Sequence, residues 1–414
     1  GPKARACAGN GEWQTRAAAK SVPGGQALLP VGIPVTPGEG IRPIQGESIE
    51  EVRILPMYDL AIVGAGPAGA MLARLIGTRH RVLLLDRRRL DTDPRPGRAE
   101  KCCGGLLAPD AQQVLAELGL GVPREVLSGP QLFSVRTLDA DHGLERAYQR
   151  FYINCHRDLF DRWLVSRVPS GVATRFGALV TGLETDAAGA TLILAGGETV
   201  RARLVVGADG ARARIRRLAF PRWPAPPQYL AVQEWCAAEA VLPYFTAIFD
   251  RAVTDFYGWT IPKDDHLIIG AALAPGGDAL ETFARFKARL AGWGISCGPV
   301  VKREGALVAR PSALAQLCPG AGRVLLIGEA AGWISPSSAE GLSYAFRSAI
   351  ALADSLDDLD GVAARYRRAC AGLRRNILGK LLKSPFMYAP WLRALVLRAG
   401  VGSLAVRGAS AETP

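Results

Sequence analysis

Residues 58–86 constrain the fold more than any other part of the chain. An apolar run over 60–63 leads into the glycine-rich turn G-A-G-P-A-G at 64–69. The pattern predicts a helix over about 67–77 and a second buried strand over 80–85. Continuous apolar strands with a helix between them are typical of a parallel sheet covered on both faces. The sequence therefore predicts an α/β fold that contains a βαβ unit.

The glycines of this turn have separate physical roles. Gly64 permits a tight turn, Gly66 lets the backbone approach a pyrophosphate, and Gly69 lets the helix pack closely on the strand. The helix N-terminus presents free N–H groups and a positive dipole end to phosphates. Asp86 ends the next strand, where its carboxylate can accept hydrogen bonds from a ribose diol. Strand, turn, helix and acid in this order predict a dinucleotide site rather than an ordinary glycine-rich loop. The residues expected to contact the dinucleotide here are Gly64, Gly66, Pro67, Ala68, Gly69, Asp86 and Arg87.

Two later segments favour FAD over NAD. One is L-V-V-G-A-D-G at 204–210, and the other is V-L-L-I-G-E-A-A-G at 324–332. Both resemble flavoprotein hydroxylases of the p-hydroxybenzoate hydroxylase fold, in which they complete the FAD site. The resemblance implies that Asp209 lies near the pyrophosphate and that Glu329, which replaces the usual Asp, contacts the flavin-side ribose. A helix that begins near Gly341 would then point its N-terminus at the flavin.

A third segment, R-D-L-F-D at 157–161, resembles the R-x-x-F-D segment whose arginine reaches the FAD in these proteins. The alternative is that Arg157 is a solvated helix charge. The further cofactor contacts that the resemblance implies are Cys103, Gly104, Arg157, Asp209, Gly210, Gly328, Glu329, Gly332, Pro336, Gly341 and Leu342.

Two more segments indicate what the flavin would do. They are K-C-C-G-G-L at 101–106 and Y-G-W-T-I-P-K at 257–263, with Ile261 where Phe is frequent. They resemble the C-G-G loop and the Y-x-W-x-x-P-K motif of the geranylgeranyl reductase family. That family reduces carbon–carbon double bonds of apolar, isoprenoid-type substrates with hydride from reduced FAD. The resemblance implies a catalytic set of Cys103, Tyr257 and Trp259.

Other interpretations stay open at this point. Tyr257 and Trp259 lie two residues apart and would also suit core aromatics, and Cys102 and Cys103 would suit small residues in a loop. The same fold serves an FAD monooxygenase that hydroxylates an aromatic or peptide-borne side chain. A halogenase is less favoured, because its W-x-W-x-I-P signature is absent, and a non-catalytic flavoprotein is a further class. NAD(P)H is a candidate electron donor, although no second complete G-x-G-x-x-G is present.

The chain divides into four parts by pattern. Residues 1–56 are rich in Pro and Gly and predict an irregular extension, so the folded domain is expected to begin at Met57. An FAD-binding domain is expected over 57–220 and 311–360, an antiparallel-sheet substrate domain over 221–310, and a helical segment over 361–414. Pro385 and Pro390 are expected to interrupt that last segment.

The bulk composition limits the partners. Eight cysteines lack metal-ligand spacing, so we expect reduced thiols, no metal and a cytoplasmic protein. The net charge of +12 comes with no nucleic-acid motif, so phosphate-bearing ligands or an anionic membrane surface explain it better than nucleic acid. The substrate expected from the resemblances is a small apolar or aromatic molecule. The last part of the chain alternates basic and apolar residues. It predicts either a helix packed on the body or peripheral contact with an anionic membrane.

Overall fold

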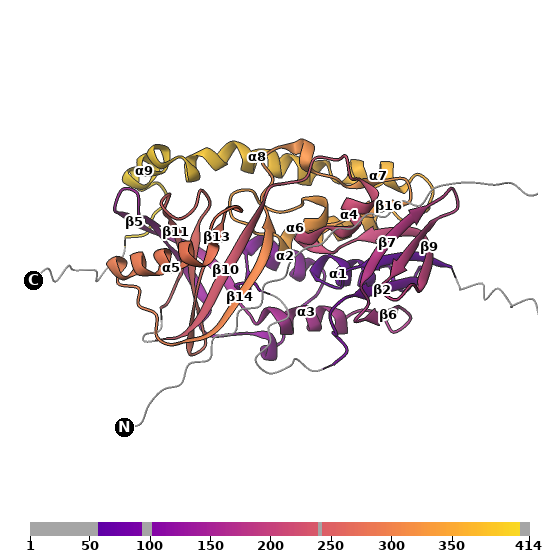
Figure 1. The fold of residues 1–414 in the computed structure, drawn as a ribbon, viewed down its shortest axis with the longest axis horizontal. Helices are drawn as coiled ribbons and strands as arrows, with labels where there is room; N and C mark the ends of the chain where they lie inside the picture. Colours follow the sequence, from indigo (N-terminus) through magenta and orange to yellow (C-terminus); the bar gives the residue numbers. More distant parts are fainter. Residues whose placement is uncertain (1–56, 93–101, 239–241, 406–414) are drawn as a thin grey trace, which may run out of the picture. The chain divides into compact units, whose positions relative to one another are not determined.

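The computed structural model describes residues 57–92, 102–238 and 242–405. The predicted irregular extension over 1–56 and Lys101 of the C-C-G-G segment lie outside these ranges. Two β-sheets and a set of covering helices make up the described part (Figure 1). No described helix is both long enough and apolar enough to cross a bilayer.

The first sheet contains the predicted βαβ unit. Its main strands run in the order β15 (Gly320–Ala321), β16 (Val324–Leu326), β9 (Thr199–Gly207), β1 (Tyr58–Val63), β2 (Val82–Asp86) and β6 (Ala173–Phe176). The hairpin of β7 (Val180–Thr185) and β8 (Ala190–Leu194) extends it from β9. From β16 to β6 every pairing is parallel, and β1, β2 and β16 are buried along most or all of their length, as their continuous apolar sequences predict.

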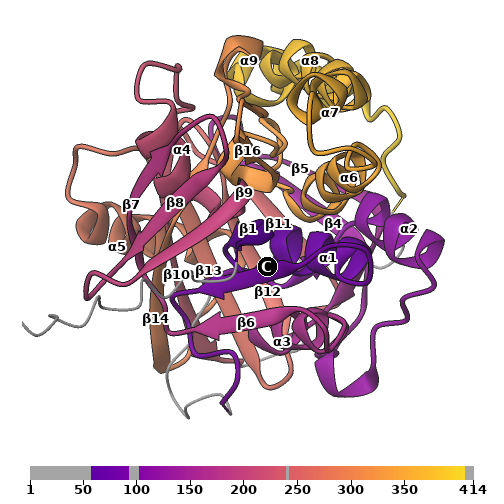
Figure 2. The same ribbon diagram turned by 90° about the vertical axis from the view of Figure 1, so that its right-hand side faces the viewer.

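Helices pack beside this sheet (Figure 2). α1 (Pro67–Ile76) packs on α6 (Leu342–Ala353) and on α3 (Arg157–Ser166). The smaller helices α2 (Pro109–Glu117) and α4 (Arg214–Ala219) complete this part. The βαβ unit and the helix after Gly341 are therefore confirmed.

The second sheet is mostly antiparallel. Its order is β14 (Val300–Ala309), β10 (Gln228–Ala237), β13 (His266–Leu273), β12 (Gly258–Lys263), β11 (Phe245–Phe249), β4 (Leu132–Asp139), β5 (Leu144–Asn154) and β3 (Leu106–Leu107). The segment over 106–154, which the sequence placed in the FAD-binding domain, supplies three of these strands. β11 pairs with β4 in parallel, a long-range contact that local sequence patterns do not encode.

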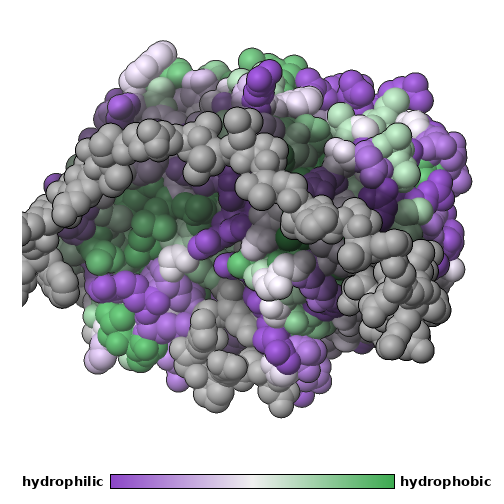
Figure 3. All heavy atoms as spheres, turned by 45° about the vertical axis from the view of Figure 1, so that its right-hand side comes forward, coloured by the Kyte–Doolittle hydropathy of each residue, from purple (hydrophilic) through white to green (hydrophobic). Residues whose placement is uncertain are grey.

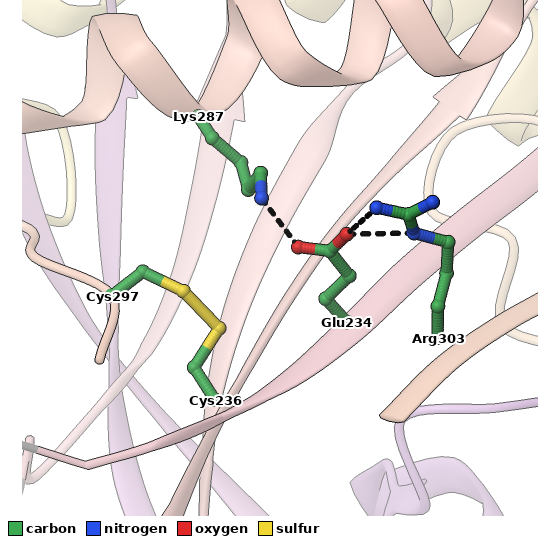
Figure 4. Close-up of a disulfide and its surroundings, with 5 residues drawn as sticks. All are labelled: Glu234, Cys236, Lys287, Cys297 and Arg303. Carbon is green, nitrogen blue, oxygen red and sulfur yellow. Dashed lines mark hydrogen bonds and ion pairs between the residues drawn. A yellow bond between two sulfur atoms is a disulfide. The ribbon is translucent and has the colours of Figure 1, made fainter. Parts of the chain in front are cut away.

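A disulfide joins Cys236 at the end of β10 to Cys297 in the segment after α5 (Ala279–Leu290) (Figure 4). The Cα atoms of the two residues are 5.7 Å apart across a sequence separation of 61 residues. The expectation of uniformly reduced thiols is wrong for this pair, because the fold brings two distant cysteines to bonding distance. Beside it, buried Glu234 accepts from Lys287 Nζ at 2.6 Å and Arg303 Nε at 2.7 Å, which ties α5 and β14 to β10.

The C-terminal helices are α7 (Val362–Ala369), α8 (Ala371–Tyr388) and α9 (Pro390–Ala399). In Figure 1 they run along one side of both sheets. Pro390 begins α9, as the helix-start preference of proline allows. Pro385 does not break α8, which continues to Tyr388. The predicted break at Pro385 is therefore wrong, and the interruption lies at Ala389.

Candidate functional site

A cavity of about 1440 Å³ extends from the first βα turn to the inner face of the second sheet. Ordinary pockets for one small ligand measure roughly 300–1,000 Å³, so this cavity has room for a dinucleotide and a substrate. Hydrophobic side chains gather in a hollow on the face of the molecule drawn in Figure 3. The predicted site residues that line the cavity are Gly64, Gly66, Pro67, Ala68, Asp86, Arg87, Cys103, Gly104, Arg157, Asp209, Gly210, Tyr257, Trp259, Glu329, Gly341 and Leu342.

The turn between β1 and α1 separates two kinds of glycine. Gly64 has φ +109°, and a Cβ there would overlap the carbonyl oxygen of Ala208. A Cβ on Gly69 would overlap the carbonyl oxygen of Gly64. At Gly66 the nearest atom to an added Cβ would be Arg88 Nη2, at 4.0 Å. The protein's own packing therefore requires Gly64 and Gly69, whereas Gly66 leaves space on the cavity side for a ligand.

Asp86 ends β2 at this turn. One carboxylate oxygen accepts from Ala65 N at 2.8 Å, and the other accepts from Arg88 N at 2.8 Å. The Arg88 guanidinium also binds Asp86, with Nη2–Oδ2 at 3.1 Å, and reaches Asp161 Oδ2 at 2.9 Å. Arg88 lines the cavity as well as its neighbour Arg87, which alone was predicted to contact the cofactor. The position of Arg88, two residues after the acid that ends the strand, was the sequence feature that could have predicted its contact with the site.

Asp209 is a buried carboxylate that lacks a partner for one oxygen. Oδ2 accepts from Ile215 N at 3.1 Å, but Oδ1 has no hydrogen-bond partner among the described residues. Burial raises the pKa of Asp209 above its ordinary value. An orphaned acceptor at a cavity wall fits a ligand that brings a hydroxyl or N–H donor, as FAD does. Glu329 lies close by, since a Cβ on Gly210 would be 3.9 Å from its Oε2, and its Oε1 accepts from Ala309 N at 2.8 Å.

Arg157 begins α3 and points inward. Its side chain is 9% exposed, and it donates from Nε to Asp161 Oδ1 at 2.8 Å and from Nη1 to Cys103 Sγ at 3.3 Å. The alternative of a solvated helix charge is therefore wrong. Asp161 lies one helical turn further along α3, so the R-x-x-F-D spacing places both charges on one face.

The two glycines after Cys103 lie close to other parts of the protein, and Gly105 is required by the backbone around it. A Cβ on Gly104 would overlap Ile261 Cδ1 of β12. Gly105 has φ +68°, and a Cβ there would overlap the carbonyl oxygen of Cys155. The loop is therefore packed closely between β12 and the segment that leads into α3.

Tyr257 and Trp259 line the cavity together, with ring centroids 5.7 Å apart. Tyr257 Oη donates to the carbonyl oxygen of Ser338 at 2.8 Å, and burial raises its pKa far above the usual range of tyrosine. A Cβ on Gly270 of β13 would overlap the indole of Trp259, so this glycine makes room for the ring. Trp259 Nε1 has no partner among the described residues.

Lys263, the last residue of the Y-x-W-x-x-P-K motif, does not line the cavity. It is buried, and Nζ donates to Asn154 Oδ1 at 2.6 Å and to the carbonyl oxygen of Cys155 at 2.7 Å. Burial lowers the pKa of Lys263 to about 8. This lysine joins β12 to the end of β5, beside the C-G-G loop.

Four predicted cofactor residues lie behind the cavity wall: Gly69, Gly328, Gly332 and Pro336. A Cβ on Gly328 would come within 2.9 Å of Ala68 Cβ, and the carbonyl oxygen of Pro336 accepts from Arg310 Nε at 3.3 Å. In front of them, Glu340 Oε1 accepts from Ser343 N at 2.8 Å at the start of α6. Gly341 and Leu342 bring the positive end of this helix to the cavity.

α8 and α9 provide a wall of the cavity that the sequence did not predict. Residues from these helices and the turn after them that line it are Arg375, Asn376, Gly379, Lys380, Lys383, Phe386, Met387, Tyr388, Arg393, Val396, Leu397 and Val401. Tyr388 Oη donates to the carbonyl oxygen of Ser337 at 2.7 Å, and Tyr344 Oη bonds Asn376. The basic and apolar alternation of this segment was visible, but not its place beside the site.

Comparisons with known proteins agree with this geometry. Residues 57–222 match the family model of an FAD binding domain. Protein CbrA of Escherichia coli O6:H1 is 38% identical over 351 residues, which cover 84% of this chain and 94% of that protein. Protein CbrA of Shigella flexneri serotype 5b is 39% identical over 352 residues, with the same coverage of 84% and 94%. The chain belongs to the CbrA family.

Solved structures with this fold are more distant in sequence. A geranylgeranyl bacteriochlorophyll reductase-like protein from Thermoplasma acidophilum has a TM-score of 0.70 at 19% identity, and the match covers 86% of this chain and 94% of that one. PqsL of Pseudomonas aeruginosa, a probable FAD-dependent monooxygenase, has a TM-score of 0.62 at 20% identity, with 83% and 100% covered. The chain has the p-hydroxybenzoate hydroxylase-type fold and is an FAD-dependent oxidoreductase, with FAD as its cofactor.

Proposed function

We propose that this protein reduces isolated carbon–carbon double bonds in an elongated apolar substrate. The observation that supports this most is the apolar wall of the cavity on the side of the second sheet. Its apolar members are Val135, Ala231, Phe245, Ala247, Phe249, Tyr257, Trp259, Ile261, Ala306 and Val308. An isoprenoid chain has almost no polar handle, so a site for it must work through shape and exclusion of water.

The residues of the chain would hold this substrate against the cofactor. When bound, reduced FAD supplies a hydride to one alkene carbon, and a proton is added at the other. Trp259 is held over Gly270 and Tyr257 is fixed by Ser338, so both rings present defined surfaces. The Tyr257 hydroxyl keeps its proton at ordinary pH, because burial raises its pKa. We propose Tyr257 and Cys103, which both line the cavity, as proton-bearing groups beside the substrate.

Two motifs of the sequence and one solved structure support this proposal. The C-G-G loop and the Y-x-W-x-x-P-K motif resemble geranylgeranyl reductases, and the Thermoplasma protein carries that description. The electron donor proposed is NAD(P)H. Bleaching of the flavin absorbance by NADH or NADPH under anaerobic conditions would identify it.

A second candidate is hydroxylation of an aromatic or peptide-borne side chain. Gln233 favours it, because this fully buried cavity residue has an Oε1 without a partner in the described part of the chain. Such an acceptor suits a substrate with a hydroxyl or amino donor. The likeness of PqsL, a probable monooxygenase, points the same way.

One experiment separates the two. The reduced protein is mixed with a geranylgeranyl-chain lipid under anaerobic conditions, and the masses of the products are measured by mass spectrometry. A gain of two hydrogens for each reduced bond supports the reductase. Product that appears only with oxygen, and that carries an added oxygen atom, would favour the monooxygenase instead.

A variant checks the wall. Trp259→Phe should lower kcat/KM for the prenyl lipid by roughly tenfold, because the smaller ring loses contact area. FAD content should stay unchanged. Trp223→Phe is the matched control, since Trp223 lies outside the cavity lining and is 37% exposed.

A further inference from the structure

The exposed large apolar side chains of the described residues are concentrated near the end of the chain. The group in α8, α9 and the following turn consists of Leu378, Leu382, Phe386, Trp391, Leu395, Val396, Val401 and Leu404. We name this group the apolar face. Three of its members are well over half exposed: Leu382 at 69%, Trp391 at 65% and Val401 at 72%. Scattered single apolar residues are normal on a surface, but a contiguous group indicates a binding surface.

The apolar face follows the helical repeat. Leu378, Leu382 and Phe386 recur every four residues on α8, and Trp391 and Leu395 do so on α9. The core side of α8 is a different sector, where Leu373 and Ile377 are buried. These helices thus bury one apolar side in the protein and keep a second one exposed.

The charge around the apolar face has one sign. Residues 361–405 contain nine arginines and lysines and no acidic residue. Arg393 is buried in an ion pair with Asp139, but the other basic residues of α8 and α9 form no ion pair with any residue that the structure describes. These are Arg374, Arg375, Lys380, Lys383 and Arg398. An exposed apolar stripe bordered by unpaired cations complements an anionic lipid surface.

The cavity reaches the surface at this face. Phe386, Val396 and Val401 both belong to the apolar face and line the cavity. Lys380 and Lys383 line it from the adjoining sector of α8. The mouth of the cavity is therefore bordered by the same apolar and basic side chains.

We propose that the apolar face of α8 and α9 docks on an anionic lipid bilayer and presents the mouth of the cavity to it. Trp391 suits the membrane interface, where an amphipathic ring sits at the level of the headgroups. The basic residues would add electrostatic attraction that salt weakens. Entry of an apolar substrate from the bilayer would follow, and that consequence alone rests on the proposed function.

The test is cosedimentation of the full chain with vesicles. The vesicles are phosphatidylcholine alone or phosphatidylcholine with phosphatidylglycerol. We expect binding to the anionic vesicles that is at least about tenfold tighter than to the neutral ones. The double variant Leu382→Glu with Trp391→Glu should weaken that binding by at least about tenfold. Neither residue lines the cavity.

A matched control carries the same change elsewhere. Leu280→Glu with Val301→Glu alters two residues that are 55% and 58% exposed on α5 and β14, outside the apolar face. This control should bind anionic vesicles like the unchanged protein. Flavin absorbance and thermal unfolding show whether each variant is folded. If the glutamates disturb folding, Arg374→Gln with Arg398→Gln tests the charge alone and should reduce the anionic preference.

Either of two results would overturn the proposal. One is the absence of binding to anionic vesicles by the unchanged protein. The other is that the face variant and its control bind anionic vesicles equally well, whether both lose binding or both keep it. Vesicle binding needs no turnover, so its failure would leave the proposed reductase activity standing.

Discussion

At the scale of single residues, the glycines of the first turn fall into two groups, according to whether an added Cβ would clash with the protein itself or with a bound ligand. Gly64 and Gly69 are surrounded by the backbone of their own chain. Gly66 has an extended backbone with φ −76°, which any residue adopts, and open space where its Cβ would lie. A methyl group at position 66 would instead keep a pyrophosphate from approaching the backbone closely.

This difference predicts that the glycines fail in different ways. Gly66→Ala should fold normally but bind FAD at least about tenfold more weakly, because the added methyl collides with the ligand only. Gly64→Ala should lower the free energy of unfolding even without FAD, because of the clash with Ala208 and the positive φ. Flavin titration and denaturant unfolding of the apoprotein measure the two effects.

Gly119→Ala serves as the control for the backbone. Gly119 has φ +65°, but nothing lies within 4 Å of an added Cβ. It should cost about 1 kcal/mol of stability and leave the FAD affinity unchanged. Unfolding of apo Gly66→Ala as severe as that of Gly64→Ala would contradict the division.

At the scale of elements, the C-terminal helices are held to the second sheet by buried cations. Arg393 of α9 donates from Nη2 to Asp139 Oδ1 at 2.8 Å, at the end of β4, and packs over the ring of Phe249. Arg310, which follows β14, lies between the rings of Phe256 and Tyr388, 4.2 Å from each centroid. These contacts place α8 and α9 over the cavity.

Loss of the first contact should loosen α9. Arg393→Ala leaves the fully buried carboxylate of Asp139 without its arginine, which should lower the free energy of unfolding by about 3 to 5 kcal/mol. Faster amide exchange over 390–399 would show where the structure opens. Arg398→Ala, an exposed change on the same helix, should alter neither measurement. Equal effects of the two changes would argue against an anchoring role for Arg393.

At the scale of the whole molecule, the burial of Lys263 makes the stability depend on pH. Lys263 comes from β12 and bonds Asn154, at the end of β5 in the same sheet, and Cys155, in the segment that leads into α3. Its pKa is lowered by burial from 10.5 to about 8. Between these two values the unfolded chain binds more protons than the folded one, so the stability contributed by this residue rises with pH.

This sign can be measured with one variant. Lys263→Met removes the titrating group, and its lost hydrogen bonds cost the same at every pH. The unfolding free energy of the unchanged protein, relative to that of the variant, should increase by about 2 kcal/mol between about pH 7.5 and about pH 10. Denaturant titrations at the two pH values give the difference. A difference that stays flat or falls would show that Lys263 is not buried as a charged group.

Much of the cofactor-binding half was readable from local patterns. The β1–α1–β2 unit follows from periodicity and turn residues, which depend on neighbours in the chain, whereas the helix after Gly341 was expected from resemblance. The inward position of Arg157 was implied by resemblance, and the structure decided against the open alternative of a solvated helix charge. The roles of Tyr257 and Trp259 came from resemblance, and they remain proposals.

Only the tertiary structure decided which distant segments of the chain are in contact. By itself the sequence determined a dinucleotide-binding turn, its strand-ending acid and a basic, apolar C-terminal segment. It did not determine that residues 106–154 join the second sheet, that Cys236 bonds Cys297, or that α8 walls the cavity. Helix and strand periods are set by neighbouring residues, whereas these pairings depend on how completed elements pack, and no short pattern records that.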